Sequence, residues 1–366
     1  LPYSFTFQLL IQSAFIEDWP RFAHRGVLLD TSRHFLPVSV IKTNLELMAQ
    51  NKFNVFHWHI VDDQSFPYRS ELFPNLADKG AFSRRHVYSL DEIRALVEFA
   101  AVRGIRVLPE FDTPGHTLSW GNAVAGLLTE CFDSSSKPIG TFGPIDPTNP
   151  VNYDFLLALV SEIRSVFPEE FFHLGGDEVS FDCWRSNPSV IEFMKQVGYG
   201  TDYSRLQNYY FQRLLDVIKA AGLYDNFLVW QEVFDNNNTL SSDIFVHVWK
   251  GYSNLEWGRT LQSVTAKGLP AILSSCWYLN YIRYGVDWQA FYDCDPHSFK
   301  GTDEQKKLVL GGEACMWGEY VDKTNVIPLL WPRASAVAER LWSSADVRDT
   351  TLAASRLDEH RCRMLR

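Results

Sequence analysis

The stretch FFHLGGDE, residues 171–178, is a short apolar run that passes through two glycines and ends in two adjacent acids. Short apolar runs bounded by turn-forming residues are typical of buried strands. Gly175 and Gly176 allow the backbone to bend tightly and a ligand to come close, because glycine has no side chain. We therefore predict a buried strand that delivers the carboxyl groups of Asp177 and Glu178 to its C-terminal end.

Seven further runs of the same design lie along the chain, and helical patterns separate most of them. This alternation predicts a parallel sheet, and eight such strands predict a closed (β/α)8 barrel, an α/β fold of the TIM-barrel type. Residues 1–20 do not fit this count, so we interpret them as the remnant of a preceding domain or a linker, and residues 21–366 as one barrel domain. The predicted strands span residues 26–30, 55–62, 105–112, 171–178, 227–232, 244–249, 271–277 and 309–317, and the predicted helices residues 90–102, 153–166, 203–221, 255–267 and 326–342.

The ends of the predicted strands carry reactive and aromatic side chains. In barrels of this type the site is built at the C-terminal ends of the strands, so these side chains should form a ring. Flat aromatic faces suit the apolar faces of sugar rings, and we interpret the tryptophans as walls around a sugar rather than as core residues. The strand ends carry Asp30, Asp62, Asp112, Asp177 with Glu178, Trp230 with Glu232, Trp249, Trp277 with Tyr278, and Trp317.

Composition and charge exclude several classes of function. The net charge is −10 and no basic stripe is present, which argues against a nucleic-acid partner. No run approaches the roughly 18 apolar residues of a membrane span, so no membrane span is expected. The six cysteines show no C-x-x-C spacing, which argues against a zinc ribbon or a thioredoxin-like site and leaves disulfide pairing open.

The adjacent acids Asp177 and Glu178 predict acid–base chemistry. Two ionised carboxylates repel each other in a semi-buried cleft, so one of the two pKa values should be raised, as a general acid near neutral pH requires. A metal site or a solvated turn is the alternative. In a two-carboxylate glycosidase, a partner about 5 Å away would act as nucleophile, whereas about 6.5–9.5 Å would leave room for water. Candidates for that partner are Asp112, Glu232, Glu313 and Glu319.

Histidines on the second predicted strand have two interpretations. His57 and His59 lie on one face of the strand, and such a pair can bind zinc if His247 and Asp62 supply further ligands. Buried, hydrogen-bonded histidines are the interpretation that we favour.

The segment DTPGH, residues 112–116, ends the third predicted strand in a turn. Asp112 and His116 could pair across that turn, and a histidine held in this way beside Glu178 would tune the proton donor. Simple pinning of the loop is the alternative. Arg33 follows the first strand, and its planar guanidinium suits either paired sugar hydroxyls or a salt bridge to a strand-end aspartate.

Taken together, these motifs resemble the family 20 glycoside hydrolases of the lysosomal β-hexosaminidase type. Their order and spacing match over nearly the whole chain, which makes the resemblance far more specific than a lone Gly-Gly-Asp-Glu. The matching motifs are HRG (24–26) with DTSRH (30–34), FHWH (56–59) with DD (62–63), EFDTPGH (110–116), HLGGDE (173–178), WQE (230–232), WYLN (277–280) and MWGE (316–319).

The resemblance implies a catalytic domain that removes terminal β-linked GlcNAc or GalNAc as an exo-acting β-N-acetylhexosaminidase, by substrate-assisted retention. Glu178 would be the general acid and base, and the substrate's own 2-acetamido oxygen would be the nucleophile. Asp177 would orient and stabilise the oxazolinium-type intermediate, while Tyr278 would hydrogen-bond the acetamido oxygen. Substrate binding would fall to Arg33, Asp62, His116, Trp230, Trp249, Asn280, Trp317 and Glu319.

The resemblance also carries expectations for the whole protein. It implies a glycan substrate, no cofactor or metal, a dimeric assembly and a lysosomal or secreted location. We expect the chain to lack most of the family's small N-terminal α+β domain. Tyr281 stands where the α-type subunit carries an arginine, so a preference for sulfated or sialylated substrates is not expected. Asn237 begins a sequon in a polar stretch and is a candidate glycosylation site.

The cysteines add expectations about covalent links. Cys131 and Cys183 match a family disulfide that joins two barrel loops. Cys276 and Cys294 could pair with each other. Cys362 should be a free thiol, because the family partner further along is missing from this chain.

Overall fold

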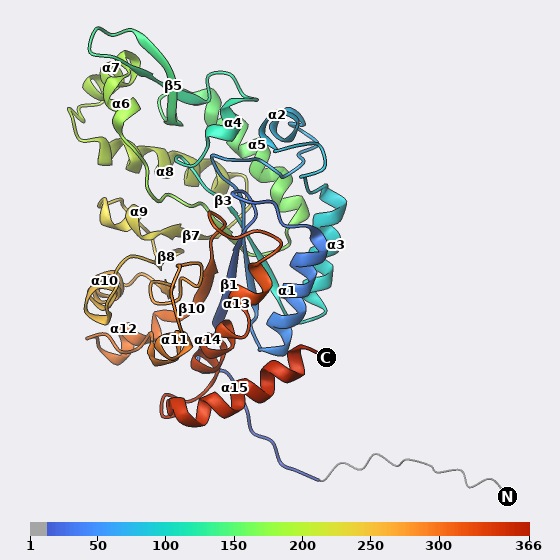
Figure 1. Cartoon of the computed structure of the whole chain (residues 1–366). Helices are drawn as coiled ribbons and strands as arrows, with labels where there is room; N and C mark the ends of the chain where they lie inside the picture. Colours follow the sequence, from blue (N-terminus) through green and yellow to red (C-terminus); the bar gives the residue numbers. More distant parts are fainter. Residues whose placement is uncertain (1–12) are drawn as a thin grey trace, which may run out of the picture.

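The computed structural model describes residues 13–366, and their centre is a closed barrel of parallel strands (Figure 1). The strand order around the barrel is β1-β10-β9-β8-β7-β6-β3-β2, so β1 closes the sheet by pairing with β10. The predicted (β/α)8 barrel is therefore confirmed. Its strands are β1 (His24–Asp30), β2 (Val55–Val61), β3 (Arg106–Phe111), β6 (Phe171–His173), β7 (Asn226–Trp230), β8 (Ile244–Val248), β9 (Ala271–Leu273) and β10 (Val309–Met316).

Helices surround the barrel, with α1 and α3 on one side and α10 and α12 on the other in the view of Figure 1. The predicted helices agree with α3, α5, α8 and α10 to within a few residues. The helices are α1 (Val38–Gln50), α2 (Asn75–Gly80), α3 (Leu90–Ala101), α4 (Leu118–Gly121), α5 (Pro150–Val166), α6 (Asp182–Ser186), α7 (Pro188–Gln196), α8 (Tyr203–Ala220), α9 (Gln231–Asp235), α10 (Asn254–Ala266), α11 (Trp288–Asp293), α12 (Asp303–Lys307), α13 (Val326–Leu330), α14 (Arg333–Trp342) and α15 (Thr350–Met364).

The predicted helix 326–342 is in fact two helices, α13 and α14, that meet at Trp331 and Pro332. Proline has no backbone N–H to donate and its ring crowds the preceding turn, so a continuous helix cannot pass through this point.

Several predicted strands are too long at their C-terminal ends. The ladder of β6 stops at His173, and the backbone then turns through Gly175 and Gly176 with φ values of 72° and 98°. A Cβ atom at Gly175 would collide with the side chain of Asp112, so only glycine fits this turn. The strands predicted at 227–232 and 271–277 likewise end early, at Trp230 and Leu273. The polar residues therefore lie just beyond the strands, on the rim of the barrel.

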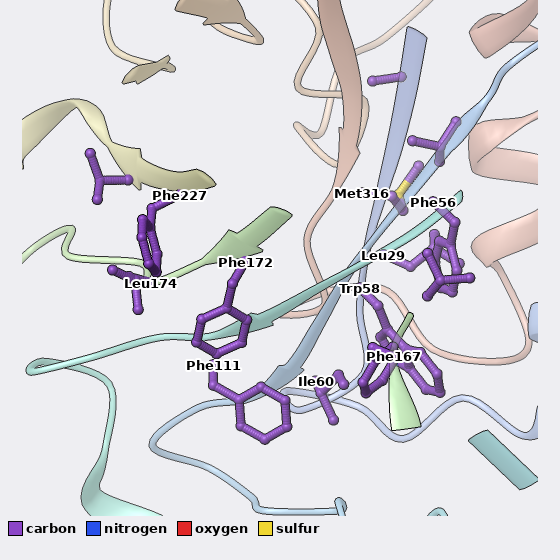
Figure 2. Close-up of a cluster of buried hydrophobic side chains, with 14 of the residues drawn as sticks. Leu29, Phe56, Trp58, Ile60, Phe111, Phe167, Phe172, Leu174, Phe227 and Met316 are labelled. Carbon is purple, nitrogen blue, oxygen red and sulfur yellow. The ribbon is translucent and has the colours of Figure 1, made fainter. Parts of the chain in front are cut away.

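Side chains on the strands alternate between the barrel interior and the surrounding helices. Phe56 and Trp58 of β2 belong to the large apolar core that fills the space between barrel and helices (Figure 2). His57 and His59 contact Glu110 instead, in the barrel interior. A smaller apolar cluster forms a separate layer of buried strand residues, namely Val55, Leu108, Leu228 and Ile272.

Two disulfides link segments outside the strands. Cys131 on β4 (Leu128–Phe132) is joined to Cys183 on α6, which attaches the hairpin of β4 and β5 (Pro138–Ile145) to that helix. Cys276 is joined to Cys294, so both pairings agree with the predictions. The exposed Cys362 is free, as expected, and the buried Cys315 is also a free thiol.

Of the predicted remnant at residues 1–20, residues 1–12 lie outside the part that the structure describes. Residues 13–20 contain no helix or strand. Asp18 connects this segment to the barrel domain through Lys52 at 2.6 Å and the indole N–H of Trp342 at 2.7 Å. Between residues 13 and 366, no helix combines the length and the apolar character needed to cross a bilayer.

Candidate active site

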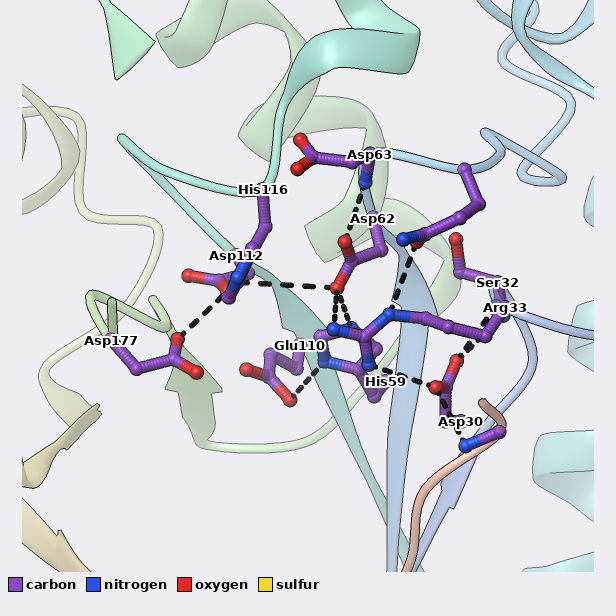
Figure 3. A network of polar contacts seen from close by, with 12 residues as sticks. Asp30, Ser32, Arg33, His59, Asp62, Asp63, Glu110, Asp112, His116 and Asp177 are labelled. Carbon is purple, nitrogen blue, oxygen red and sulfur yellow. Dashed lines mark hydrogen bonds and ion pairs between the residues drawn. The ribbon is translucent and has the colours of Figure 1, made fainter. Parts of the chain in front are cut away.

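Asp177 and Glu178 lie on the turn that follows β6, at the C-terminal rim of the barrel. Asp177 is buried, whereas the Glu178 side chain is 60% exposed. The imidazole of His116 lies between them, with Nδ1 3.6 Å from Asp177 Oδ1 and Nε2 3.6 Å from Glu178 Oε2. His116 Nδ1 also approaches Asp112 Oδ2 at 2.5 Å, so the predicted pairing of these two residues is present (Figure 3).

The pKa values of Asp177 and Glu178 differ from the expectation that one of the two is raised. The contact with His116 holds the pKa of Glu178 below its usual value. Burial alone would raise the pKa of Asp177, but the charge of His116 lowers it, so neither acid shows the expected rise in the free site. Burial raises the pKa of Asp112 well above its usual value, and the charge of Asp177 adds to this effect. Burial alone would lower the pKa of His116, but the charges of Asp177 and Asp112 raise it. The prediction failed because a cationic imidazole lies between the neighbouring acids and offsets their repulsion.

Four aromatic side chains from consecutive strand ends gather at the same rim. We call them the aromatic cluster: Trp230 is the last residue of β7, Trp249 follows β8, Tyr278 lies beyond the end of β9 and Trp317 follows β10. The ring centroids of Trp230 and Trp317 are 5.7 Å apart, and those of Trp249 and Tyr278 are 6.0 Å apart. Sequence reasoning placed all four at the site, and the structure brings them together.

Trp277 does not belong to the aromatic cluster, which corrects its interpretation as a wall around a sugar. Its side chain is fully buried in the core outside the barrel, where the indole N–H donates to the carbonyl of Phe291 at 2.9 Å. Neighbouring residues of an extended segment point to opposite faces, so Tyr278 can face the rim only if Trp277 turns away from it.

Three of the buried polar atoms at this rim have no hydrogen-bond partner within residues 13–366. They are Oδ1 of Asp177, Nε1 of Trp317 and Oδ1 of Asn280. Buried polar groups in folded proteins are nearly always hydrogen-bonded, so each of these atoms requires a particular reason. One donor and two acceptors beside an aromatic cluster suit a ligand that has both a polar amide or hydroxyl group and an apolar face.

Arg33 forms a charged group with acids from three other positions on the rim, of which Figure 3 shows Asp30 and Asp62. Its guanidinium nitrogens lie 2.9 Å from Asp30 Oδ2 and 2.9 Å from Asp62 Oδ2, and 3.8 Å from Glu319 Oε1. Arg33 therefore forms the salt bridges to strand-end aspartates that were one of its two interpretations. The Glu319 side chain is 48% exposed, so this part of the group remains open to solvent and to a ligand.

Buried imidazoles and carboxylates contact one another in a row through the barrel interior. We call this row the interior chain, and its members are Glu313, His57, Glu110, His59 and Asp62. Glu313 contacts His57 Nδ1 at 2.8 Å, and Glu110 contacts both His57 Nε2 at 3.0 Å and His59 Nδ1 at 2.8 Å. His59 Nε2 then reaches Asp62 Oδ2 at 2.9 Å. The two histidines are therefore buried and hydrogen-bonded, as favoured from the sequence.

The zinc alternative does not fit the donors that the structure brings together. Ring nitrogens of His57, His173 and His247 do converge, but within residues 13–366 His59 belongs to no cluster of possible metal ligands. His173 Nδ1 accepts the backbone N–H of Gly175 at 3.1 Å, which leaves its proton on Nε2, the atom that a metal would need. Burial alone would lower the pKa of His57, but the charge of Glu313 and the contact with Glu110 raise it to about 9, so its ring holds both protons.

The four candidate partner carboxyls have different surroundings. Glu313 and Asp112 are fully buried, and Glu232 is held by the indole N–H of Trp249 at 2.8 Å and by Lys250 at 3.0 Å. These partners favour supporting roles for the three acids over attack on a sugar. Glu319 is the exposed member of the set.

Sequence reasoning assigned no role to Glu110, although it lies at the centre of the interior chain. Its position follows from the pairing of β2 with β3, in which His59 is directly in register with Glu110. That register depends on the barrel itself and could not be read from spacing along the chain.

The comparisons with known proteins agree with this geometry. Residues 22–345 match the family model described as "Glycosyl hydrolase family 20, catalytic domain". The chain is 55% identical to the human β-hexosaminidase subunit beta over 97% of its own length, and 53% identical to the bovine subunit alpha over 96%. It spans 63% and 66% of the lengths of these two relatives.

Solved structures give the same assignment. The chitobiase of Flavobacterium johnsoniae superposes with a TM-score of 0.82 at 34% identity, over 94% of this chain and 52% of that one. The exo β-N-acetylglucosaminidase of Vibrio harveyi, in complex with N-acetylglucosamine, gives 0.80 at 28% identity, over 94% and 58%. Because the family match, the identities and the barrel all agree, the chain belongs to glycosyl hydrolase family 20.

Proposed function

We propose that this chain is the catalytic domain of an exo-acting β-N-acetylhexosaminidase that removes terminal β-linked GlcNAc or GalNAc from glycans. The names of its relatives support this activity and substrate class. The observation that carries the proposal is the buried Oδ1 of Asp177, which accepts no hydrogen bond from residues 13–366, beside an exposed carboxyl at Glu178. A substrate amide N–H can satisfy the first, and a glycosidic oxygen can take a proton from the second.

The proposed reaction is substrate-assisted and retains the anomeric configuration. Glu178 donates its proton to the glycosidic oxygen as that bond breaks and the alcohol leaves. The acetamido carbonyl oxygen bonds to the anomeric carbon, and Asp177 accepts the amide N–H and stabilises the positive charge of the oxazolinium ring. Glu178 then takes a proton from water, which attacks the anomeric carbon while the ring opens to restore the acetamide. In both steps the Tyr278 hydroxyl donates a hydrogen bond to the acetamido oxygen.

The lowered pKa of Glu178 fits a proton donor that works at acidic pH. Because the pKa lies below its usual value in the free site, the acid form becomes abundant only as the pH falls. A bound sugar would also displace water from this half-exposed carboxyl, and desolvation raises the pKa of an acid. Of the two proposed locations, lysosomal and secreted, the acidic lysosome agrees with the first of these effects.

The remaining site residues would bind the sugar. Arg33 and Glu319 would bind ring hydroxyls, with Asp62 holding Arg33 in place and His116 flanking Glu178. The tryptophans and Asn280 would surround the acetamido group and the sugar ring. A dimeric assembly, and a glycan on the exposed Asn237, remain predictions for the whole protein.

Aryl glycosides provide the decisive test. We expect hydrolysis of aryl β-N-acetylglucosaminide and aryl β-N-acetylgalactosaminide that is unaffected by a chelator. The 2-hydroxy analogue should be a far poorer substrate, because it lacks the internal nucleophile. Equal rates for the acetamido substrate and the 2-hydroxy analogue would overturn the mechanism, and loss of activity with the chelator would favour a metal enzyme.

A further inference from the structure

Glu110 is the only acid of the interior chain, within the described residues, that hydrogen-bonds a side chain of the aromatic cluster. It is fully buried on β3, in register with His59 on β2 and His173 on β6. One carboxylate oxygen, Oε2, contacts His59 Nδ1 at 2.8 Å. The other, Oε1, accepts the indole N–H of Trp230 at 2.7 Å. A single carboxylate therefore connects the interior chain to the substrate-facing rim.

Stability alone does not explain a charged residue at this position. Burial alone would raise the pKa of Glu110, but the charge of His59 and the hydrogen bonds with His57 and His59 lower it well below its usual value, so the group is ionised. Replacing a buried ion pair with well-packed apolar residues is often neutral or stabilising. A buried carboxylate bonded to an indole at the rim therefore indicates a function besides stability.

We propose that Glu110 is a positioning residue, which fixes the indole of Trp230 and thereby sets which N-acyl groups the enzyme accepts on its sugar. The inference rests on the proposed function, in which the aromatic cluster surrounds the acetamido group. Trp230 stacks on His247 with ring centroids 4.2 Å apart, and this contact sets the plane of the indole. The hydrogen bond to Glu110 sets its rotation within that plane, so the two contacts together define the space left for the acyl chain.

The same carboxylate also supports the opposite side of the rim. Through His59 it reaches Asp62 at 2.9 Å, and Asp62 holds Arg33 at 2.9 Å. Movement of Glu110 would therefore change the positions of both the Trp230 indole and Arg33, which is proposed to bind ring hydroxyls.

Glu313 offers a matched control in the same barrel. It is also a fully buried carboxylate bonded to two imidazoles, His24 at 2.6 Å and His57 at 2.8 Å. Within residues 13–366 it has no hydrogen bond to the aromatic cluster. Changing Glu313 therefore removes a buried carboxylate that reaches Glu110 through His57, but it leaves both partners of the bond between Glu110 and Trp230 in place.

The experiment compares kcat/KM for aryl glycosides that carry N-acetyl and N-propanoyl groups. The ratio of the two values is the readout, because a fraction of misfolded enzyme lowers both values equally and leaves the ratio unchanged. We expect Glu110→Gln and Trp230→Phe each to change this ratio by about 10-fold, the size typical of losing one buried hydrogen bond. The double variant should change it no further than the larger single variant, because both act on one contact.

Glu313→Gln should lower Tm but leave the acyl ratio within about twofold of the wild type, because it leaves the Trp230 contact intact. If Glu110→Gln does not fold, Glu110→Asp keeps the charge, shortens the side chain and should change the ratio in the same direction. An unchanged ratio in the folded Glu110 variants, or additive effects in the double variant, would overturn the inference. A wild-type enzyme inactive on both acyl substrates would instead defeat the proposed function.

Discussion

His116 Nε2 lies 3.6 Å from Glu178 Oε2, and the opposite nitrogen of the same ring faces Asp112 and Asp177. One imidazole therefore touches both the exposed acid and the buried pair of acids. The contact with His116 lowers the pKa of Glu178, so the strength of the proposed proton donor depends on a residue that lies far from it in the sequence.

Replacing His116 with asparagine should raise the pKa of Glu178, because the group that lowers it is gone. The alkaline limb of the pH profile of kcat/KM reports loss of the acid form, so this limb should move to higher pH. His86→Asn, which changes an exposed histidine on a loop, serves as the control. A limb that moves to lower pH, or does not move, would contradict the assigned role.

Glu178→Gln should lower kcat/KM by about 10²–10⁴-fold, the range expected when a general acid is lost. The loss should shrink for aryl leaving groups of low pKa, which depart without protonation. Because the Glu178 side chain is 60% exposed, Tm should change little. Equal losses for good and poor leaving groups would show that the residue acts in another way.

Asp177→Asn should impair formation of the cyclic intermediate, with a loss of about 10²–10³-fold in kcat. Binding of a stable thiazoline analogue of that intermediate should weaken in parallel, which calorimetry can measure. Asp182→Asn, on the exposed start of α6, is the matched control. Unaltered binding of the analogue would remove Asp177 from the proposed mechanism.

The protein should become less stable at alkaline pH, because His57 in the interior chain loses its proton there. The pKa of His57 is raised to about 9 from its ordinary 6.5, so its contribution is fully present below pH 6.5 and is lost as the pH rises through about 9. Tm should therefore fall between these two pH values, and His57→Gln should flatten that fall. A variant whose Tm follows the wild-type curve would show that His57 makes no such contribution.

The thiols should differ sharply in reactivity. A thiol reagent should modify one cysteine per native chain, Cys362, which is exposed on α15. Cys315 is buried and its pKa is raised by burial, so it should react only after denaturation. Two reactive thiols in the native protein would contradict the protection of Cys315 by burial, and four or more in denaturant without reductant would contradict the two disulfides.

Much of the fold was predictable from local patterns. Apolar runs such as 55–62 identify the strands, and the period of two along β2 places Phe56 and Trp58 on one face and His57 and His59 on the other. The endings of the strands also placed Asp177 and Glu178 at the rim, because all parallel strands of a barrel end at the same face.

Tertiary structure alone decided how these groups act on one another. The bond between Glu110 and Trp230 joins residues 120 positions apart, and it exists only because the barrel closes with a particular register. The lowered pKa of Glu178 and the outward turn of Trp277 have the same origin. Periodicity along a chain reports which face a side chain takes, whereas charge, hydrogen bonding and burial depend on neighbours that only the folded barrel supplies.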